Sequence, residues 1–197
     1  MLSNLSGQRR YGEEQRAQGQ LELSQEALYG FAISHGRLPC PANPTLDSAA
    51  SDAGNEDCSR EYGVLPWRTL GLGETDPWGQ RLSYYVRQTF TTPPASGARA
   101  GFSLDSIGNA NIRPAANAGN KLADALPAVL VSHGRNGFGG YRQNGQRTSA
   151  SHLDEQENAD ADLIFVNRLP DDNYDDQVIW LTSSILNSRL LAAGRMP

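Results

Sequence analysis

The segment between residues 38 and 79 divides this chain into a helical part and a sheet-forming part. It reads Leu38-Pro39-Cys40-Pro41, continues through a polar loop to Cys58, and passes through Gly63-Val64-Leu65-Pro66-Trp67 to Asp76-Pro77-Trp78-Gly79. An amphipathic segment precedes it, and β-prone alternating sequence follows it. We expect a joint where the helix meets the sheet, with Trp67 and Trp78 packed there. Its structural residues are Pro39, Pro41, Trp67, Asp76, Trp78 and Gly79.

The composition indicates a folded protein with many loops. Only 38% of the 197 residues are hydrophobic, but seven Tyr, three Trp and several aliphatic clusters argue against disorder. The twenty Gly and eleven Pro residues predict many turns. The net charge is −5 and the basic residues form no stripe, so we do not expect nucleic acid as a partner.

The two cysteines, Cys40 and Cys58, are predicted to form a disulfide. A loop of this length gives a stabilisation of about 3 kcal/mol in the chain-entropy model. Two unrelated buried thiols are the alternative, and metal ligation is disfavoured because no further Cys or His lies near them to complete a tetrahedral site. A disulfide implies an oxidising compartment. No signal peptide is evident, so we expect the chain to be a mature or trimmed form.

Residues 3 to about 35 are predicted to form one long helix. Its polar first half, Gly7–Gln20, is expected to project into solvent or to lie against another molecule. Gly36 and Pro39 are typical of a helix end. We assign residues 1–36 to this helix and residues 37–197 to a globular sheet domain. Apolar or small residues recur at helical spacing at Ala17, Leu21, Leu28, Phe31 and Ala32.

The rest of the chain predicts a mostly antiparallel sheet and a short final helix. Gly108-Asn109 is expected to turn a hairpin between 102–107 and 111–113. Asp175 is expected to cap a helix that Gly194 ends. The fold class is therefore α+β, with a long N-terminal helix on the sheet. Further strands are expected at Arg81–Phe90, Ala128–Ser132 and Asp162–Asn167.

No pattern indicates a catalytic site. The histidines are His35, His133 and His152, and adjacent Ser132 and His133 would point to opposite faces of a strand. The glycine-rich segment 134–145 lacks a phosphate-binding pattern and is expected to be a tight loop with positive φ angles. We therefore expect a protein that is not an enzyme.

An acidic segment between residues 154 and 176 offers oxygen ligands. Together with the glycine-rich loop, it suggests a calcium site made by Asn136, Asp160 and Asp162, because Ca²⁺ prefers oxygen atoms on flexible backbone. A solvated acidic surface without a metal is the alternative that the sequence leaves open.

The order of several short motifs resembles minor pilins and pseudopilins of type IV pilus and type II secretion systems. The resemblance covers most of residues 21–197. The motifs are "GRLPCPA", "GVLPW" and "DPWG", followed by "AVLVSHGRNG", "ENADAD" and "DDQVIWL". The major pseudopilins of this family have a calcium site in a loop that resembles residues 132–140 and 157–162. By that match Asn136 stands where the family often has Asp, and Asp160 and Asp162 match acidic positions.

The resemblance implies a structural subunit of a filament. Such a subunit is anchored in the bacterial inner membrane by an apolar helix, and then joins other pilin or pseudopilin subunits in a periplasmic or extracellular filament. This chain lacks the apolar half and the cleavage motif, so we expect both upstream of Met1. One alternative is a binding module or adhesin at the filament tip that uses residues 91–127. The other is a periplasmic hydrolase.

Overall fold

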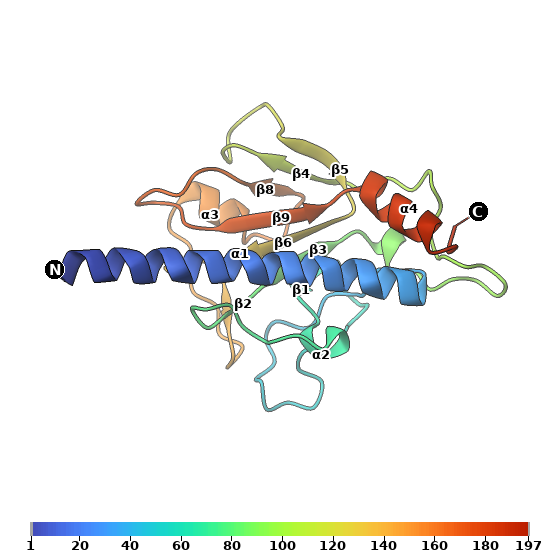
Figure 1. Cartoon of the computed structure of the whole chain (residues 1–197), viewed down its shortest axis with the longest axis horizontal. Coiled ribbons are helices and arrows are strands. Elements are labelled where there is room, and N and C mark those ends of the chain that lie inside the picture. The colour runs from blue at the N-terminus through green and yellow to red at the C-terminus, as the bar shows by residue number, and fades with distance from the viewer. Residues whose placement is uncertain (1, 197) are drawn as a thin grey trace.

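The computed structural model describes residues 2–196, so Met1 and Pro197, at the ends of the two expected domains, lie outside the described residues. The helices are α1 (Leu2–His35), α2 (Trp67–Leu70), the 3₁₀ turn η1 (Gln88–Phe90), α3 (Leu153–Glu157) and α4 (Ser183–Ala192). The strands are β1 (Tyr62–Val64), β2 (Gln80–Arg81), β3 (Ser83–Val86), β4 (Ala110–Arg113), β5 (Ala123–Leu126), β6 (Ala128–Ser132), β7 (Tyr141–Arg142), β8 (Ile164–Val166) and β9 (Gln177–Leu181). Figure 1 shows this mixed α+β arrangement.

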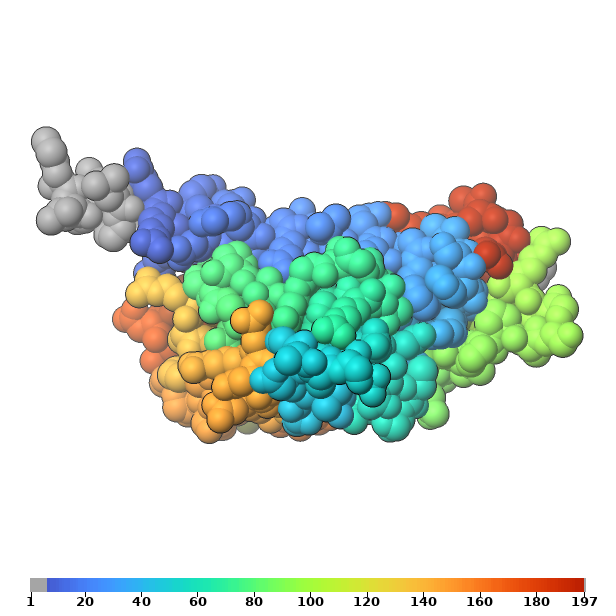
Figure 2. Space-filling model, turned by 90° about the horizontal axis from the view of Figure 1, so that it is seen from below, coloured from blue at the N-terminus to red at the C-terminus, as the bar shows by residue number. Residues whose placement is uncertain are grey.

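The predicted long helix is confirmed as α1. It lies along the whole length of the body (Figure 2), and its N-terminal end extends past the body (Figure 1). The helix ends at His35, and the following Gly36 has φ 70° and donates its N–H to the carbonyl of Ala32. Within residues 2–196, no helix combines the length and the apolar character that a membrane span requires. The apolar face of α1 buries Ala17, Leu21, Leu28, Tyr29 and Ala32.

The body is built on a four-stranded antiparallel sheet with the order β1-β3-β6-β9. Tyr84 and Leu130 are cross-strand partners and belong to the core cluster that includes the buried residues of α1. Tyr85 and Val129, one residue along each strand, belong to the cluster shared with the second sheet. Since side chains alternate along a strand, the sheet is covered on both faces. This explains the continuous apolar run of β6, predicted as a buried strand and confirmed.

The second sheet has the order β5-β4-β8. β4 pairs with β5 antiparallel, whereas β4 and β8 are parallel, so the fold is mostly but not wholly antiparallel. A separate two-stranded ladder joins β2 to β7. The strand predicted at Asp162–Asn167 is confirmed as the shorter β8.

The prediction of one continuous strand over Arg81–Phe90 is wrong. The chain changes sheets at Leu82, because β2 pairs with β7 and β3 pairs with β1 and β6. The final residues, Gln88–Phe90, turn into η1, and Phe90 is buried in the core beside α1.

The prediction of a hairpin around Gly108-Asn109 is also wrong. Strand β4 finds its antiparallel partner in β5, and no strand is assigned to residues 102–107. The final helix begins later than expected, since Gln177–Leu181 is strand β9. Thr182, rather than Asp175, caps α4 by accepting a hydrogen bond from the N–H of Ile185. Gly194, with φ 68°, follows the helix end as predicted.

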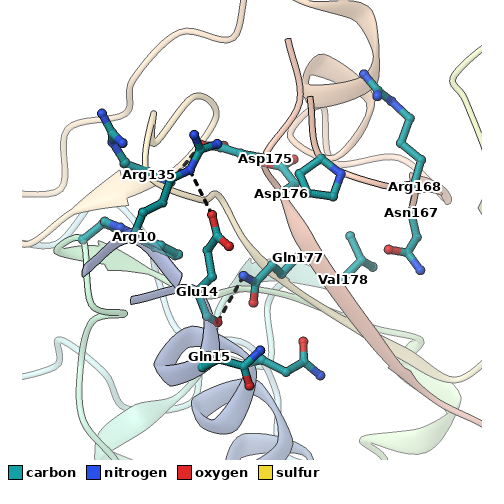
Figure 3. A pocket seen from close by; sticks show the side chains of 13 residues that line it. Arg10, Glu14, Gln15, Arg135, Asn167, Arg168, Asp175, Asp176, Gln177 and Val178 are labelled. Atoms are coloured by element: carbon teal, nitrogen blue, oxygen red, sulfur yellow. Dashed lines mark hydrogen bonds and ion pairs between the residues drawn. The ribbon is translucent and has the colours of Figure 1, made fainter. Parts of the chain in front are cut away.

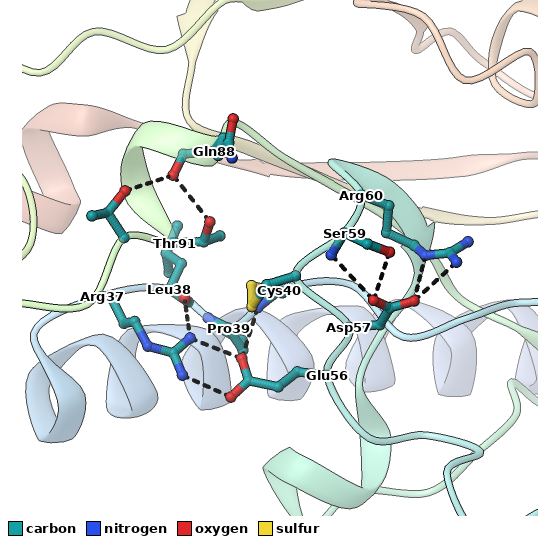
Figure 4. The surroundings of a disulfide bond; sticks show 12 residues. Arg37, Leu38, Pro39, Cys40, Glu56, Asp57, Ser59, Arg60, Gln88 and Thr91 are labelled. Carbon is teal, nitrogen blue, oxygen red and sulfur yellow. Dashed lines mark hydrogen bonds and ion pairs between the residues drawn. A yellow bond between two sulfur atoms is a disulfide. The ribbon is translucent and has the colours of Figure 1, made fainter.

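The predicted disulfide between Cys40 and Cys58 is present. Figure 4 shows its surroundings, where Glu56 accepts two hydrogen bonds from Arg37, at 2.7 and 2.8 Å, and a third from the backbone N–H of Cys40 at 3.0 Å. The Tyr84 hydroxyl donates to the carbonyl of Pro39 at 3.1 Å. The end of α1 is thereby tied to the loop after it and to β3.

Trp67 lies in a third apolar cluster beneath the loop 41–58, with Ala42, Ala53 and Val64. The expectation that it packs in the core between helix and sheet is therefore wrong. The Arg81 guanidinium covers its ring, 4.8 Å from the centroid.

Candidate functional site

Three acidic side chains meet where α3, β9 and the glycine-rich loop come together. Glu155 lies on α3, and Asp175 and Asp176 lie just before β9. One carboxylate oxygen from each lies within 4.8 Å of the others, and we call these three residues the carboxylate cluster. Figure 3 shows Asp175 and Asp176 beside Arg10, Arg135 and the polar side of α1.

The glycine-rich loop supplies most of the hydrogen bonds that position the cluster. Glu155 Oε1 accepts from Asn136 Nδ2 at 2.7 Å and from the N–H of Asp175 at 3.3 Å. Asp175 Oδ2 accepts from the N–H groups of Arg135 and Asn136 at 3.0 and 3.1 Å. Asp176 Oδ2 accepts from the Asn158 amide at 2.8 Å. Each carboxylate is therefore held through one of its oxygens.

The other oxygen of each carboxylate is buried without a hydrogen-bond partner among the residues that the structure describes. These atoms are Glu155 Oε2, Asp175 Oδ1 and Asp176 Oδ1. Burial raises the pKa of Glu155 and Asp175, and it raises that of Asp176 well above its usual range. The cluster is thus an unfavourable place for negative charge unless a proton or a cation shares it.

The backbone of the loop at the cluster requires glycine. Gly134 has φ 58°, and a Cβ at this position would lie 2.1 Å from Asp175 Oδ1. Positive φ angles recur at Gly137, Gly139 and Gly145, so the prediction of a tight loop is confirmed. The loop can therefore approach the Asp175 carboxylate more closely than any other residue type would allow.

His133 adjoins the cluster in a buried Ser–His–Asp arrangement. Its Nε2 lies 2.7 Å from Ser83 Oγ, and its Nδ1 lies 3.9 Å from Asp176 Oδ1. Burial lowers the pKa of His133 to about 3, so the ring is neutral near pH 7. Ser83 is only 1% exposed, which keeps its hydroxyl out of reach of a substrate. We assign this array to the packing of β3 against β6.

The contact between Ser83 and His133 joins strand β3 to the residue that follows β6, fifty positions along the chain, whereas the sequence pattern drew attention only to the neighbours Ser132 and His133. Ser132 instead donates from Oγ to Asp76 Oδ2 at 2.8 Å. No local spacing in the sequence could indicate the contact between Ser83 and His133.

The residues of the predicted calcium site lie in two places. Asn136 contacts the carboxylate cluster, as described above. Asp160 and Asp162 are exposed and belong to a separate turn, where Asp160 Oδ1 accepts from the N–H of Asp162 and Asp162 Oδ1 accepts from the N–H of Ile164. Within residues 2–196, neither belongs to a group of acidic, His or Cys side chains close enough to hold a metal together.

The Asp76–Gly79 turn connects the body to α1. The buried Asp76 accepts from the N–H groups of Trp78 and Gln80 through Oδ1. Gly79 has φ 82°. Trp78 Nε1 donates to Glu13 on α1 at 3.3 Å. These bonds align the turn between the helix and β6.

A second possible metal group, Cys40, Glu56 and Cys58, is already used otherwise. Its two sulfur atoms are joined in the disulfide, and its carboxylate is paired with Arg37. The carboxylate cluster is therefore the better candidate for a ligand site.

Comparison of the chain with protein-family models, with curated proteins and with solved structures finds no significant match.

Proposed function

We propose that this chain is a structural subunit of a bacterial filament of the pilin or pseudopilin type, assembled through its N-terminal helix. The observation that carries the proposal is the unequal packing of α1. Residues 7–11 are exposed, whereas the body covers one face of the helix from Ala17 to Ala32. At about 1.5 Å per residue the 34-residue helix is about 50 Å long, which is long for a body of this size.

The body is attached to α1 at points along most of the helix. Gln20 Nε2 donates to the carbonyl of Thr75, and Gln25 Nε2 donates to that of Trp180, each at 2.8 Å. Arg189 of α4 forms a bidentate pair with Glu26 at 2.6 and 2.7 Å. A body held at several points follows the orientation of the helix, as a subunit displayed on a helical filament core requires.

The polar half of α1 is only partly free. The expectation that all of Gly7–Gln20 projects from the body is wrong, because Ala17 is fully buried and Glu13 accepts a hydrogen bond from Trp78. The outward face, which includes Gln15, Arg16 and Gln18, remains exposed. We propose that this face and the free N-terminal turns meet neighbouring subunits, and that an apolar membrane anchor lies ahead of them in the full-length protein.

Cysteine cross-linking in cells that produce the full-length protein tests the proposal. Both cysteines of the described chain are used in the disulfide, so a cysteine introduced at the exposed Gln8 is the single free thiol within residues 2–196. We expect a bifunctional thiol reagent to give dimers and higher species from a periplasmic or surface fraction. The control is a variant with a cysteine at the exposed Asp52, in the loop between Cys40 and Cys58. This variant should stay monomeric. Monomer alone from the Gln8 variant, or a chain confined to the cytoplasm, would contradict the proposal.

One observation favours the alternative of a tip-located binding module. The segment 91–127 carries large apolar side chains that are exposed, namely Leu104 at 46%, Ile107 at 62% and Leu122 at 52%. If this segment binds a ligand, Ile107→Asp should abolish attachment to it and leave cross-linking at position 8 unchanged. Loss of cross-linking in the same variant would instead place the segment at a subunit contact.

A further inference from the structure

We propose that the carboxylate cluster of Glu155, Asp175 and Asp176 binds one Ca²⁺ ion, which joins α3 to the start of β9. The ligand atoms would be Glu155 Oε2, Asp175 Oδ1 and Asp176 Oδ1, the buried oxygens that have no hydrogen-bond partner within residues 2–196. The proposal uses none of the aspartates in the exposed turn at residues 160–162, and it does not depend on assembly into a filament.

The burial of these side chains distinguishes the cluster from an ordinary acidic surface. Glu155 is 0% exposed and Asp176 is 4% exposed. A buried carboxylate oxygen without a partner is costly, by about 1–3 kcal/mol or more for a charged group. Here such oxygens converge from two segments that are about twenty residues apart in the chain. Their convergence points to a shared ligand that is lodged between them.

Side chains balance the charge of the cluster only in part, since Arg10 and Arg135 lie near Asp175 without forming an ion pair with it. No Lys or Arg in the described part of the chain forms an ion pair with Glu155, Asp175 or Asp176. Arg168, the nearest guanidinium along the chain, pairs with Asp154 and Asp171 instead. A divalent cation would supply the missing positive charge.

The distances suit calcium. Ca²⁺ binds oxygen at about 2.3–2.6 Å, so two of its ligands are at most about 5 Å apart. One carboxylate oxygen from each of the three residues lies within 4.8 Å of the others, so the three side chains can share one such ion. All three are hard carboxylate oxygens, which Ca²⁺ prefers and which suit Zn²⁺ less well than thiolate or imidazole.

A surface pocket adjoins the cluster at Asp175. A pocket of about 430 Å³ is lined by Asn136 and Asp175 and opens between Arg10, Arg135 and the acidic pair Asp171 and Asp172. Asp175 belongs to both the pocket and the cluster, so an ion that enters the pocket meets a cluster ligand.

Protons shared between the carboxyl groups are the competing explanation, since they would also neutralise the cluster. Calorimetric titration separates the two. The full chain, treated with chelator and dialysed at pH 7.5, is titrated with CaCl₂. We expect one Ca²⁺ bound per chain and, at a hundredfold excess over Kd, a rise in Tm of about 5–10 °C.

Two nearly isosteric variants locate the ion. Asp176→Asn and Glu155→Gln keep the accepting oxygens that are already hydrogen-bonded and remove one charged ligand each. Each should weaken Ca²⁺ binding by at least about tenfold and reduce the rise in Tm at the same CaCl₂ concentration to about half or less. Asp162→Asn, in the exposed turn, is the matched control and should bind as the unaltered chain does. Near-ultraviolet circular dichroism shows whether each variant is folded. If only one of Asp176→Asn and Glu155→Gln folds, that variant alone is enough for the test.

Three results would overturn the proposal. The first is the absence of both binding heat and a Tm rise with the unaltered chain, which would leave shared protons as the explanation. The second is calcium binding that persists in folded Asp176→Asn or Glu155→Gln, or that is lost in Asp162→Asn. The third is an equal rise in Tm with NaCl at matched ionic strength, which would indicate general screening of charge.

Discussion

The indole Nε1 of Trp78 donates a hydrogen bond to Glu13 Oε2 over 3.3 Å, and this bond ties the Asp76–Gly79 turn to the polar half of α1. It lies on the N-terminal side of Ala17, the first fully buried residue of α1 counted from Gly7. The turn thus supports a part of the helix that has little apolar contact of its own.

Replacing this indole by a ring without a donor should loosen the helix locally. We expect Trp78→Phe to lower hydrogen-exchange protection of the amides of residues 13–20, and to leave protection in β3 and β6 unchanged. Trp180→Phe, the same change on β9, serves as the control and should not affect those amides. Equal protection in the Trp78 variant and the unaltered chain would show that the bond does not hold the helix.

The ion pair between Arg37 and Glu56 should make stability depend on pH. The hydrogen bonds from Arg37 lower the pKa of Glu56 from its usual value of 4.5, against the opposing effect of burial. Because the folded pKa is lower than the unfolded one, the stabilisation is fully present above about pH 4.5 and is lost as the pH falls through the folded pKa.

Glu56→Gln isolates this contribution. At pH 7 we expect it to lower the free energy of unfolding by about 1–2 kcal/mol, since a charge-assisted pair becomes a weaker one. In urea titrations the difference from the unaltered chain should shrink as the pH approaches 3. A difference that stays constant between pH 7 and pH 3 would rule out the ionised pair as its source.

The disulfide is expected to be worth about 3 kcal/mol through its restriction of the unfolded chain. The double variant Cys40→Ala/Cys58→Ala should lower the free energy of unfolding by roughly this amount. Reduction of the unaltered chain with dithiothreitol should give a similar loss, which shows that the cross-link, and not the alanines, is responsible. Equal urea midpoints before and after complete reduction would refute the estimate.

Arg81 should be among the most sensitive positions outside the main core. Its guanidinium is fully buried, pairs with Glu74 at 2.8 Å and donates to the carbonyls of Pro44, Leu46 and Gln143. Arg81→Met leaves these acceptors unpaired, and we expect a loss of about 3–5 kcal/mol in the free energy of unfolding.

The neighbouring ladder offers a matched control for this change. Arg142 lies on β7, the partner strand of β2, and is exposed. Arg142→Met should change stability by no more than about 0.5 kcal/mol. The free energy of unfolding of both variants is measured by urea unfolding. Similar losses for Arg81→Met and Arg142→Met would show that the buried hydrogen bonds of Arg81 are not the source of the loss.

Features with a local cause could be predicted from the sequence. The spacing from Ala17 to Ala32 specifies the buried face of α1, and the apolar run of β6 reflects cover on both faces of the sheet. The disulfide could be predicted because the chain has only two cysteines. These signals are contained within single segments.

Features that depend on distant partners could not be predicted. Gly108 looked like a hairpin turn, but a Cβ there would lie 2.0 Å from the backbone carbon of Leu126, so the glycine permits close approach of another segment. In β9, Val178 and Leu181 fit a helical spacing, and only pairing with β6 makes the segment a strand. The carboxylate cluster likewise combines Glu155 with Asp175 and Asp176 from a distant segment. From the local sequence, these residues were expected to belong to an acidic surface, with Asp175 as a helix cap.

The bond between Cys40 and Cys58 also determines how the molecule would respond to tension. A pull on α1 passes from its last turn into the backbone at residues 36–40, which Arg37, Glu56 and Tyr84 anchor to the body. From Cys40 the covalent route to β1 runs through the disulfide and bypasses the loop between the cysteines. Stretching therefore cannot extend the loop between the cysteines. The chain transmits force from helix to sheet over a short and nearly inextensible covalent path.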